Sequence, residues 1–355
     1  APHFDTRKGR WLGVPSWPSK SIKEDIYFFN GNRLSATQNK TTFNPQLTVS
    51  SPQTTGVYGG EWCGYGLGKV APELPLDQRE DDSGSLVFDG DPLLNPISIV
   101  GEGRVKLYVS SDAPQALIAV RLNNIHPDGA VERISYGVLN LSHRESDENP
   151  DTLTPNKFYE VTVKLKGVAQ IIPKGHRLRI AVSTSYWPLI WPSPTSTVIT
   201  IDPSHSTVSL PILYDEDNFH NIKFLPPEHA QPLNMTVKKV GEESRTFTHK
   251  FDDLSTKFIV KRDDGSSIID DIGTEISFTK EKILSIKRDD PLSAAMEFNC
   301  TAQYKRDDWD ARVETTTHAT CDKTHFYLSG SLKAFSKGEL FVSRKFNQKI
   351  ERDCM

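Results

Sequence analysis

The residues of this 355-residue chain that could carry out chemistry do not form a known catalytic pattern. The glycine-rich run at 56–68 (GVYGGEWCGYGLG) contains Cys63 but no serine, so it cannot be the Gly-x-Ser-x-Gly turn that holds the nucleophile of an α/β-hydrolase. As a nucleophile, Cys63 would need a nearby histidine and an electropositive site, and the sequence offers no candidate for either. We therefore expect no catalytic residue in this chain.

Metal and cofactor motifs are also missing. Gly68-Lys69 is followed by Val70, which excludes a phosphate-binding loop, and the histidines form no H-E-x-x-H pattern. Cys300 and Cys321 flank an expected hairpin and could lie near each other, although free thiols in a reducing compartment are the favoured interpretation. We expect no metal and no cofactor, because the cysteines lack the close spacing of a zinc site; they are Cys63, Cys300, Cys321 and Cys354.

The tetrapeptide Lys-Arg-Asp-Asp occurs three times in the C-terminal part of the chain, at 261–264, 287–290 and 305–308. A calcium loop needs several oxygen ligands at fixed alternate positions, and these segments lack them. We interpret the three repeats as polar hairpin turns in which aspartate side chains cap the turn amides.

Aromatic side chains gather on two segments that could form one surface. Trp62 and Tyr65 lie in the glycine-rich run, while Tyr186, Trp187 and Trp191 lie in a loop with two Trp-Pro pairs. Proline removes a backbone donor and fixes φ, so the strand before this loop cannot continue through it. The rings could fill the end of a core, form a carbohydrate platform, or line a hydrophobic recess that faces the active site of another domain.

The elements that must position these residues are β-strands. Apolar residues alternate with polar ones along 104–109 and 159–166, whereas no segment keeps a convincing helical period. Turn signals recur at short intervals, which is typical of an antiparallel sandwich or barrel. Near the C-terminus, Met296–Tyr304 and Trp309–Thr320 predict a hairpin whose turn contains Asp307-Asp308.

Composition restricts the partners and the compartment. The 42 Lys and Arg nearly balance the 46 Asp and Glu, giving a formal charge of -4 and no reason to expect nucleic acid or an anionic membrane. No apolar run is long enough for a membrane span, and the N-terminus has no apolar signal-peptide region. We expect a cytoplasmic protein, and a homo-oligomer remains open.

Composition and turn residues divide the chain into four parts. Residues 1–24, rich in tryptophan and proline, predict an extended lead-in, and residues 25–214 hold enough strands for a jelly roll. Residues 215–232 are polar and contain Pro226-Pro227, as a linker would. Residues 233–355 form a second β block.

Six separated motifs between residues 74 and 185 resemble a known family. In order they are LPLDQREDDSGSLVFDGDPLL (74–94), GEG with VKL (101–107), SSD (110–112), RLNNIHPDG (121–129), YGVLNLSHR (136–144) and GHRLR through STS (175–185). Their order and spacing resemble the C-terminal jelly roll of the X-Pro dipeptidyl-peptidase and cocaine-esterase-like (CocE/NonD) acyl hydrolases. The resemblance implies an all-β fold, in which a galactose-binding-like jelly-roll sandwich is followed by a smaller antiparallel β domain.

The family resemblance also implies a role. In that family the catalytic Ser, Asp and His lie in an N-terminal α/β-hydrolase domain, which we expect to precede residue 1. This chain would then be the non-catalytic half of a serine hydrolase that acts on small esters or amides. The family pocket loop corresponds here to Gly59–Gly66, so Trp62 and Cys63, followed by Tyr65, are the expected pocket-lining residues.

The remaining candidate residues receive structural or docking roles. Asp77, Arg79, Arg144 and His176 are expected to form charge-assisted hydrogen bonds inside or beside the sandwich. Tyr186, Trp187 and Trp191 would brace one end of the sandwich or pack against the catalytic domain. The rival hypothesis is a carbohydrate-binding module that stacks sugars on exposed tryptophans, namely Trp62, Trp187 and Trp191.

Overall fold

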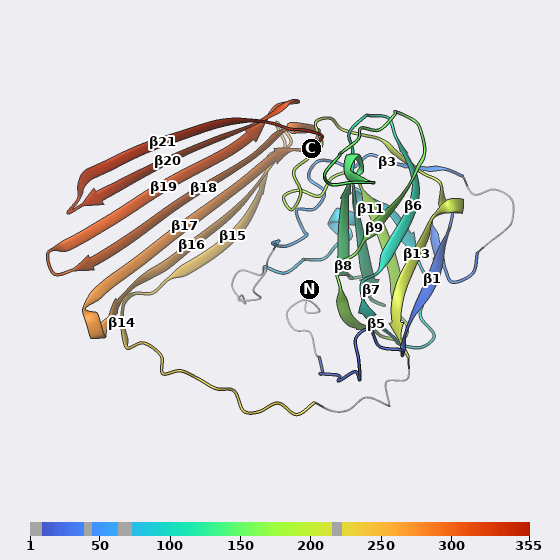
Figure 1. Cartoon of the computed structure of the whole chain (residues 1–355), viewed down its shortest axis with the longest axis horizontal. Helices are drawn as coiled ribbons and strands as arrows, with labels where there is room; N and C mark the ends of the chain where they lie inside the picture. Colours follow the sequence, from blue (N-terminus) through green and yellow to red (C-terminus); the bar gives the residue numbers. More distant parts are fainter. Residues whose placement is uncertain (1–8, 39–44, 63–72, 215–221) are drawn as a thin grey trace. The chain divides into compact units, whose positions relative to one another are not determined.

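The computed structural model describes residues 9–38, 45–62, 73–214 and 222–355, which divide into two compact units. Unit 1 contains the described residues up to Phe224 together with Cys354 and Met355, and unit 2 contains Leu225–Asp353. Both units are built from β-strands (Figure 1), and the only α-helix in the described ranges is the short α1 (Arg79–Ser83). The all-β prediction is therefore confirmed.

The described strands of unit 1 form one hydrogen-bonded sheet of thirteen strands. The main path runs β3-β12-β6-β13-β1-β2-β4-β11-β7-β8, with β5, β9 and β10 attached to it. Pairing is antiparallel except for a single parallel bridge between β2 and β4. The strands are β1 (Ile22–Asn30), β2 (Arg33–Ser35), β3 (Leu47–Val49), β4 (Leu86–Asp89), β5 (Ile97–Gly101), β6 (Arg104–Ser111), β7 (Leu117–Ile125), β8 (Val131–Asn140), β9 (Tyr159–Lys164), β10 (Val168–Ile172), β11 (Arg177–Ser183), β12 (Ile199–Ile201) and β13 (Thr207–Leu213).

One hydrophobic core lies inside this sheet. Val105 and Leu107 on β6 are fully buried while Arg104 and Lys106 are exposed, as the alternation in the sequence predicts. The same cluster takes side chains from strands along the whole sheet, so the sheet folds around a shared core. This arrangement fits a sandwich, and the strand path of a jelly roll remains a prediction.

Unit 2 is a meander of long strands. Its eight described strands form one antiparallel sheet in the order β14-β16-β17-β18-β19-β20-β21, with β15 beside β16. They are β14 (Met235–Lys239), β15 (Glu242–His249), β16 (Ser255–Ile269), β17 (Thr274–Lys287), β18 (Asp290–Arg306), β19 (Trp309–Cys321), β20 (His325–Ser336) and β21 (Glu339–Glu351). The predicted hairpin is confirmed as β18 and β19, which are joined by Asp307 and Asp308.

Two expectations about unit 2 need correction. Cys300 lies opposite Thr315, and Cys321 is six residues farther along β19, about 20 Å away at roughly 3.4 Å per residue. These two thiols therefore do not lie near each other. Of the three Lys-Arg-Asp-Asp repeats, those at 287–290 and 305–308 reach the turns between strands, whereas 261–264 lies within β16 beside a shift in strand register.

The close approach of Gly137 on β8 to the backbone of Lys164 on β9 can be tested by substitution. An added Cβ at Gly137 would lie only 2.1 Å from the carbonyl oxygen of Lys164. Gly137→Ala should lower the free energy of unfolding by roughly 1–3 kcal/mol, because a backbone atom cannot move aside cheaply. Chemical denaturation followed by tryptophan fluorescence measures this. Gly167→Ala is the control, because its Cβ would make an ordinary contact of 3.6 Å with Glu102; equal effects of the two changes would contradict the prediction.

Candidate functional site

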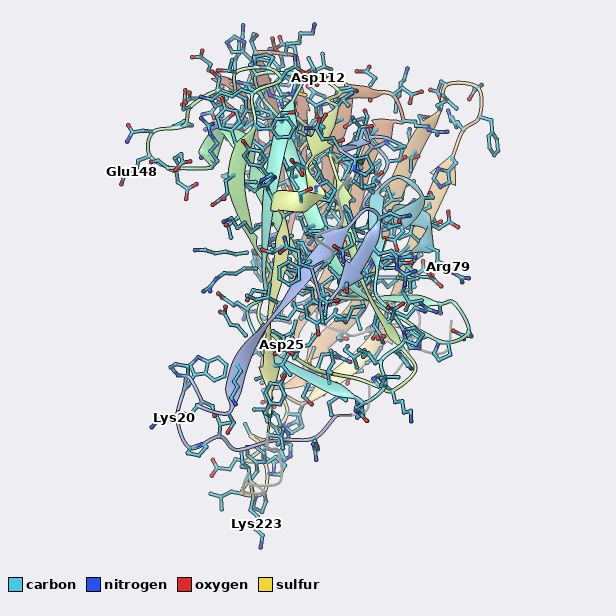
Figure 2. All side chains as sticks on the ribbon, turned by 90° about the vertical axis from the view of Figure 1, so that its right-hand side faces the viewer. Lys20, Asp25, Arg79, Asp112, Glu148 and Lys223 are labelled. Carbon is cyan, nitrogen blue, oxygen red and sulfur yellow. The ribbon has the colours of Figure 1, made fainter. Side chains whose placement is uncertain are left out.

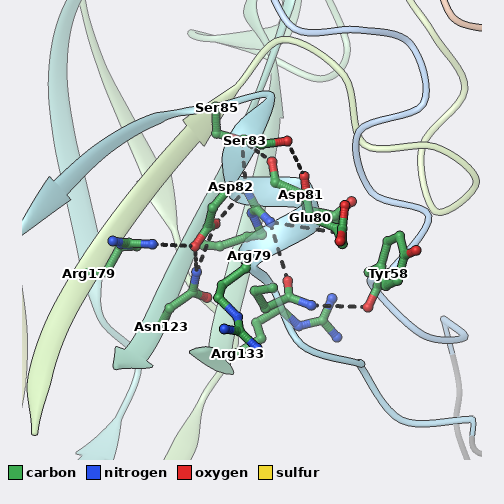
Figure 3. A network of polar contacts seen from close by, with 12 residues as sticks. Tyr58, Arg79, Glu80, Asp81, Asp82, Ser83, Ser85, Asn123, Arg133 and Arg179 are labelled. Carbon is green, nitrogen blue, oxygen red and sulfur yellow. Dashed lines mark hydrogen bonds and ion pairs between the residues drawn. The ribbon is translucent and has the colours of Figure 1, made fainter. Parts of the chain in front are cut away.

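A buried network of charged side chains lies beneath the glycine-rich loop of unit 1 (Figure 3). Helix α1 places Asp82 between two arginines: its carboxylate lies 3.0 Å from Nη2 of Arg121 on β7 and 2.9 Å from Nη1 of Arg179 on β11. Arg179 also donates two hydrogen bonds to Asp89 on β4, at 2.5 and 2.7 Å. One carboxylate of the helix thus holds two strands of the sheet together.

Asp81 connects this network to the loop above it. Its Oδ1 accepts a hydrogen bond from the backbone N–H of Gly56 at 2.8 Å, and its Oδ2 lies 3.8 Å from Arg121. Burial raises the pKa of the Asp81 carboxyl, and the nearby Arg121 opposes this shift. Asp81 and Asp82 are both paired with arginine and both are buried.

The segment that leads into the glycine-rich loop is bound to the Trp-Pro loop. Ser51 and Thr184 exchange two hydrogen bonds of 2.9 and 3.0 Å, and the N–H of Trp187 donates to the carbonyl of Thr55 at 2.9 Å. Gly56 has φ of +109°, and a Cβ there would lie 2.6 Å from the backbone of Tyr186. The two aromatic segments therefore adjoin, as expected from sequence.

Two of the three rings of the Trp-Pro loop point into unit 1, and Trp191 is partly buried. Tyr186 and Trp187 are fully buried, and the Tyr186 hydroxyl accepts a hydrogen bond from Arg133. Trp187 packs edge-on against Trp191, with ring centroids 5.6 Å apart. A buried indole cannot stack on a sugar, so the carbohydrate hypothesis loses Trp187 as a platform and keeps Trp62 and the partly buried Trp191.

Trp62 differs from Trp187 because 72% of its surface is exposed. The ammonium group of Lys166 lies 5.5 Å from the Trp62 ring and 4.8 Å from the ring of Tyr136. The guanidinium group of Arg133 also lies against Tyr136, 4.4 Å from the centroid of its ring. Cations and aromatic rings thus alternate from the surface toward the buried Tyr186, which favours one orientation of Trp62. Of the other pocket-lining candidates, Cys63 and Tyr65 lie outside the described residues.

Asp77 and Arg79 form a charge-assisted pair at the surface. Arg79 lies at the periphery of unit 1 (Figure 2), and its Nη2 donates to Oδ2 of Asp77 at 2.7 Å. Asp77 also accepts from the N–H of Val131 at 3.4 Å. Partial burial would raise the pKa of the Asp77 carboxyl, but the hydrogen bonds from Arg79 outweigh this and lower the pKa.

Arg144 and His176 contact other parts of unit 1. Arg144 donates to the carbonyl and to the carboxylate of Asp151, at 2.6 and 2.8 Å. His176 Nδ1 lies 2.9 Å from Oδ1 of Asn124, and its ring lies 4.7 Å from that of His126. These contacts fit structural roles, and the backbone N–H of His176 also donates to the carbonyl of Pro173 at the preceding turn, at 3.3 Å.

The geometry supports binding and positioning. Within the described parts of the chain, no three His, Cys, Asp or Glu side chains come together as a metal site would require. The described residues also include no helix that is long and apolar enough to cross a membrane. What the site provides is an exposed indole on a loop whose base is fixed by buried charges.

Comparison with protein families identifies unit 1. The family model of the X-Pro dipeptidyl-peptidase C-terminal non-catalytic domain matches residues 3–233, more than half of the chain. The chain belongs to this family. Family membership explains why the resemblance seen in the sequence motifs is confined to unit 1.

Curated relatives of this X-Pro dipeptidyl-peptidase C-terminal domain are larger enzymes. The cocaine esterase of Rhodococcus sp. (strain MB1 Bresler) is 28% identical over 192 residues, which cover 50% of this chain and 32% of the esterase. The Xaa-Pro dipeptidyl-peptidase of Ligilactobacillus salivarius (strain UCC118) is 23% identical over 246 residues, covering 59% and 30%. The chain thus spans about a third of the length of these relatives.

Two solved structures align with part of the chain. An aminopeptidase from the marine sediment archaeon Thaumarchaeota archaeon aligns with a TM-score of 0.49 and 18% identity, over 57% of this chain and 38% of the aminopeptidase. An alpha-amino acid ester hydrolase aligns with a TM-score of 0.46 and 20% identity, over 53% and 36%.

Sequence reasoning missed several residues of this site. Arg121 and Arg179 are the partners that bury Asp82, and Lys166 and Tyr136 lie between Trp62 and the interior. One signal was present: arginine within an apolar strand, as at 121, predicts a buried charge that needs a carboxylate partner. The sequence does not say which carboxylate.

Arg121→Met tests the buried network. Removing this arginine leaves Asp81 and Asp82 buried with less compensation, so the free energy of unfolding should fall by about 3–5 kcal/mol. Urea denaturation measures this change. Arg79→Met is the matched control and should cost far less, because water screens its exposed pair with Asp77. If both variants lost equal stability, the network would not have the proposed role.

The stability that Arg121→Met loses should depend on pH. Burial raises the pKa of Asp81 and Asp82, and without Arg121 less opposes that rise. A group whose pKa is raised by folding stabilises the fold below its unfolded pKa and loses that contribution as pH rises through the folded pKa. The deficit of Arg121→Met relative to the unchanged chain should therefore be smaller at about pH 5 than at about pH 8. A deficit independent of pH would contradict this account.

Proposed function

We propose that this chain is the accessory C-terminal part of a serine acyl hydrolase acting on small ester or amide substrates. Unit 1 would dock on an N-terminal α/β-hydrolase domain and contribute a wall of its acyl pocket. Membership of a non-catalytic domain family supports this role, as does the chain's span of about a third of its enzyme relatives. The lack of Gly-x-Ser-x-Gly in the sequence agrees with it.

The exposure of Trp62 on a fixed loop is the observation that carries this proposal. An indole exposed by 72% would lose much water-accessible apolar surface if a partner domain or a substrate packed on it. The loop is tied to Asp81 and to the Trp-Pro loop, so little conformational entropy would be lost on docking. An accessory domain that shapes a pocket needs this combination of rigidity and exposed apolar surface.

In the complete enzyme the chemistry would be divided between two parts. The catalytic domain would supply the nucleophile, the general base and the oxyanion hole for acyl transfer. This chain would contribute apolar contact through Trp62 and exclude water from one side of the pocket. Lys166 would act as a positioning residue, because its ammonium group holds the indole ring.

The isolated chain should not hydrolyse esters. Purified residues 1–355 incubated with p-nitrophenyl acetate should release p-nitrophenol at the rate of buffer alone, because the sequence has no Gly-x-Ser-x-Gly turn and unit 1 belongs to a non-catalytic domain family. Stopped-flow absorbance measures the p-nitrophenol released, and an acyl-enzyme would appear as a burst of ~1 equivalent per chain. A burst of product proportional to protein concentration would overturn the non-catalytic role.

Trp62→Ala tests the pocket wall in the complete enzyme. If the indole contacts the acyl group, kcat/KM for a small ester should fall about tenfold, mainly through KM, since the lost contact is binding energy. Lys166→Met should give a smaller loss of the same kind. Trp309→Ala is the matched control, because this half-exposed tryptophan belongs to unit 2. Unchanged kinetics for Trp62→Ala would reject the pocket role while leaving the docking role to be tested by domain association.

A further inference from the structure

A β-bulge in β8 brings a buried cation onto the same face of the sheet as an aromatic ring. Arg133 lies opposite Asn123 on β7. Tyr136 lies opposite Arg121, two residues earlier on β7, so Ile134 is an extra residue in β8. In a regular strand, residues three apart lie on opposite faces, whereas the bulge places Arg133 and Tyr136 on one face. Bulges re-aim side chains in this way beside active sites more often than elsewhere.

Arg133 is a buried charge without an anionic partner among the described residues (Figure 3). Its side chain is only 9% exposed, and it donates a hydrogen bond to the hydroxyl of Tyr186. No carboxylate in the described parts of the chain lies within ion-pair distance of it, because Asp81 and Asp82 pair with Arg121 instead. Burial of a cation is costly unless an anion accompanies it, so an anionic ligand at Arg133 would be favoured.

A second cation lies against the same aromatic ring. The guanidinium of Arg133 and the ammonium of Lys166 lie 4.4 and 4.8 Å from the centroid of Tyr136. Hydrogen bonds to its backbone hold Lys166 beside β8: its N–H donates to the carbonyl of Tyr136 at 2.9 Å, and its carbonyl accepts from the hydroxyl of Ser135 at 2.5 Å. The ammonium itself pairs with no carboxylate in the described ranges. Its N–H donors are therefore available to a ligand.

The acidic neighbours of these positions do not neutralise the two cations. Glu132 precedes Arg133 on β8, lies opposite Asn124 and accepts a hydrogen bond from that side chain at 3.3 Å. It therefore belongs to the other face of β8. Glu61 precedes Trp62 and, among the contacts of the described residues, pairs with neither cation. The positive charge of the pair is thus left for a ligand.

The glycine-rich loop adds an apolar wall and leaves the cations accessible. The exposed indole of Trp62 lies 5.5 Å from the ammonium of Lys166. An added Cβ at Gly59 would lie 3.0 Å from the hydroxyl of Tyr186 and 3.3 Å from Nη1 of Arg133. A side chain at position 59 would therefore cover the guanidinium, which glycine does not. Cations beside an apolar wall suit a carboxylate that is carried on a short carbon chain.

We propose that Arg133 and Lys166 form a subsite for a carboxylate of the substrate, with the adjoining carbon chain packed against Trp62. The identity of this ligand as part of the substrate rests on the proposed acyl-hydrolase function. The preferred substrates would be monoesters or monoamides of short dicarboxylic acids, whose free carboxylate binds here while the other end reaches the catalytic domain. Charge-assisted hydrogen bonds from the ammonium and the guanidinium supply the selectivity over neutral acyl groups.

Titration of the full chain with glutarate tests the subsite directly. Tryptophan fluorescence should change and saturate with glutarate, because Trp62 lies beside the bound carboxylate, and it should not change with neutral glutaramide at the same ionic strength. Lys166→Met should raise the Kd for glutarate about fivefold, as expected for an exposed ion pair. Lys164→Met is the matched control, because this exposed lysine on β9 contacts neither ring. Equal effects of the two variants, or equal binding of glutaramide, would overturn the subsite.

Arg133→Gln tests the buried cation in the same assay. It should weaken glutarate binding at least as much as Lys166→Met does, because a buried charge is screened less by water. Circular dichroism must match that of the unchanged chain, and the exposed variants at 164 and 166 decide the question if this variant does not fold. Unaltered glutarate binding by a folded Arg133→Gln chain would remove Arg133 from the subsite and contradict the proposal.

The complete enzyme separates the subsite from the proposed function. It should hydrolyse mono-p-nitrophenyl glutarate with a higher kcat/KM than p-nitrophenyl butyrate. Lys166→Met should lower kcat/KM for the glutarate ester about tenfold more than for the butyrate ester, mainly through KM. If Trp62→Ala slows the butyrate ester but the charged ester has no advantage, the pocket wall stands and the carboxylate assignment is wrong. If Trp62→Ala alters neither ester, the pocket function itself fails, and the substrate assignment fails with it.

Discussion

The buried ion pairs of Asp82 with Arg121 and Arg179 are the constraint on which the rest of unit 1 depends. A buried charge is tolerated only where its partners are held in place, so these pairs fix α1 against β7 and β11. Asp81, the next residue, then holds the backbone of Gly56. The position of the glycine-rich loop, and through it that of Trp62, therefore follows from charges in the interior.

The two loops of this end divide their aromatic residues between interior and surface. Tyr186 and Trp187 fill the interior, and their backbone binds the neighbouring loop. Trp62 remains outside, above Lys166. Burial of Tyr186 and Trp187 makes this end of unit 1 rigid, and the exposed indole of Trp62 provides an apolar surface for binding. This division is what a non-catalytic domain requires if it is to shape a pocket completed by another domain.

Unit 2 lacks the two-sided arrangement that gives unit 1 its core. Its long strands form a single antiparallel layer, with most side chains only partly buried. One layer cannot bury its own apolar face, so such a sheet depends on a second layer for much of its stability. The centre of one face of this sheet carries apolar side chains from β18, β19 and β20, and basic residues lie around it on β17 and on the edge strand β21.

The sequence by itself determined the β-strands, because alternation with a period of two records which side chains face the core. It predicted the buried positions of β6 and β9, the β18–β19 hairpin and the meeting of two aromatic loops, and its motifs identified the family. Only the tertiary structure decided the partners. Arg179 is 97 residues from Asp82, and nothing local selects that carboxylate over another. Likewise, Trp62 and Trp187 both lie in irregular loops rich in glycine or proline, where no period exists to tell inside from outside; burial there depends on which strands and loops the fold brings against each ring.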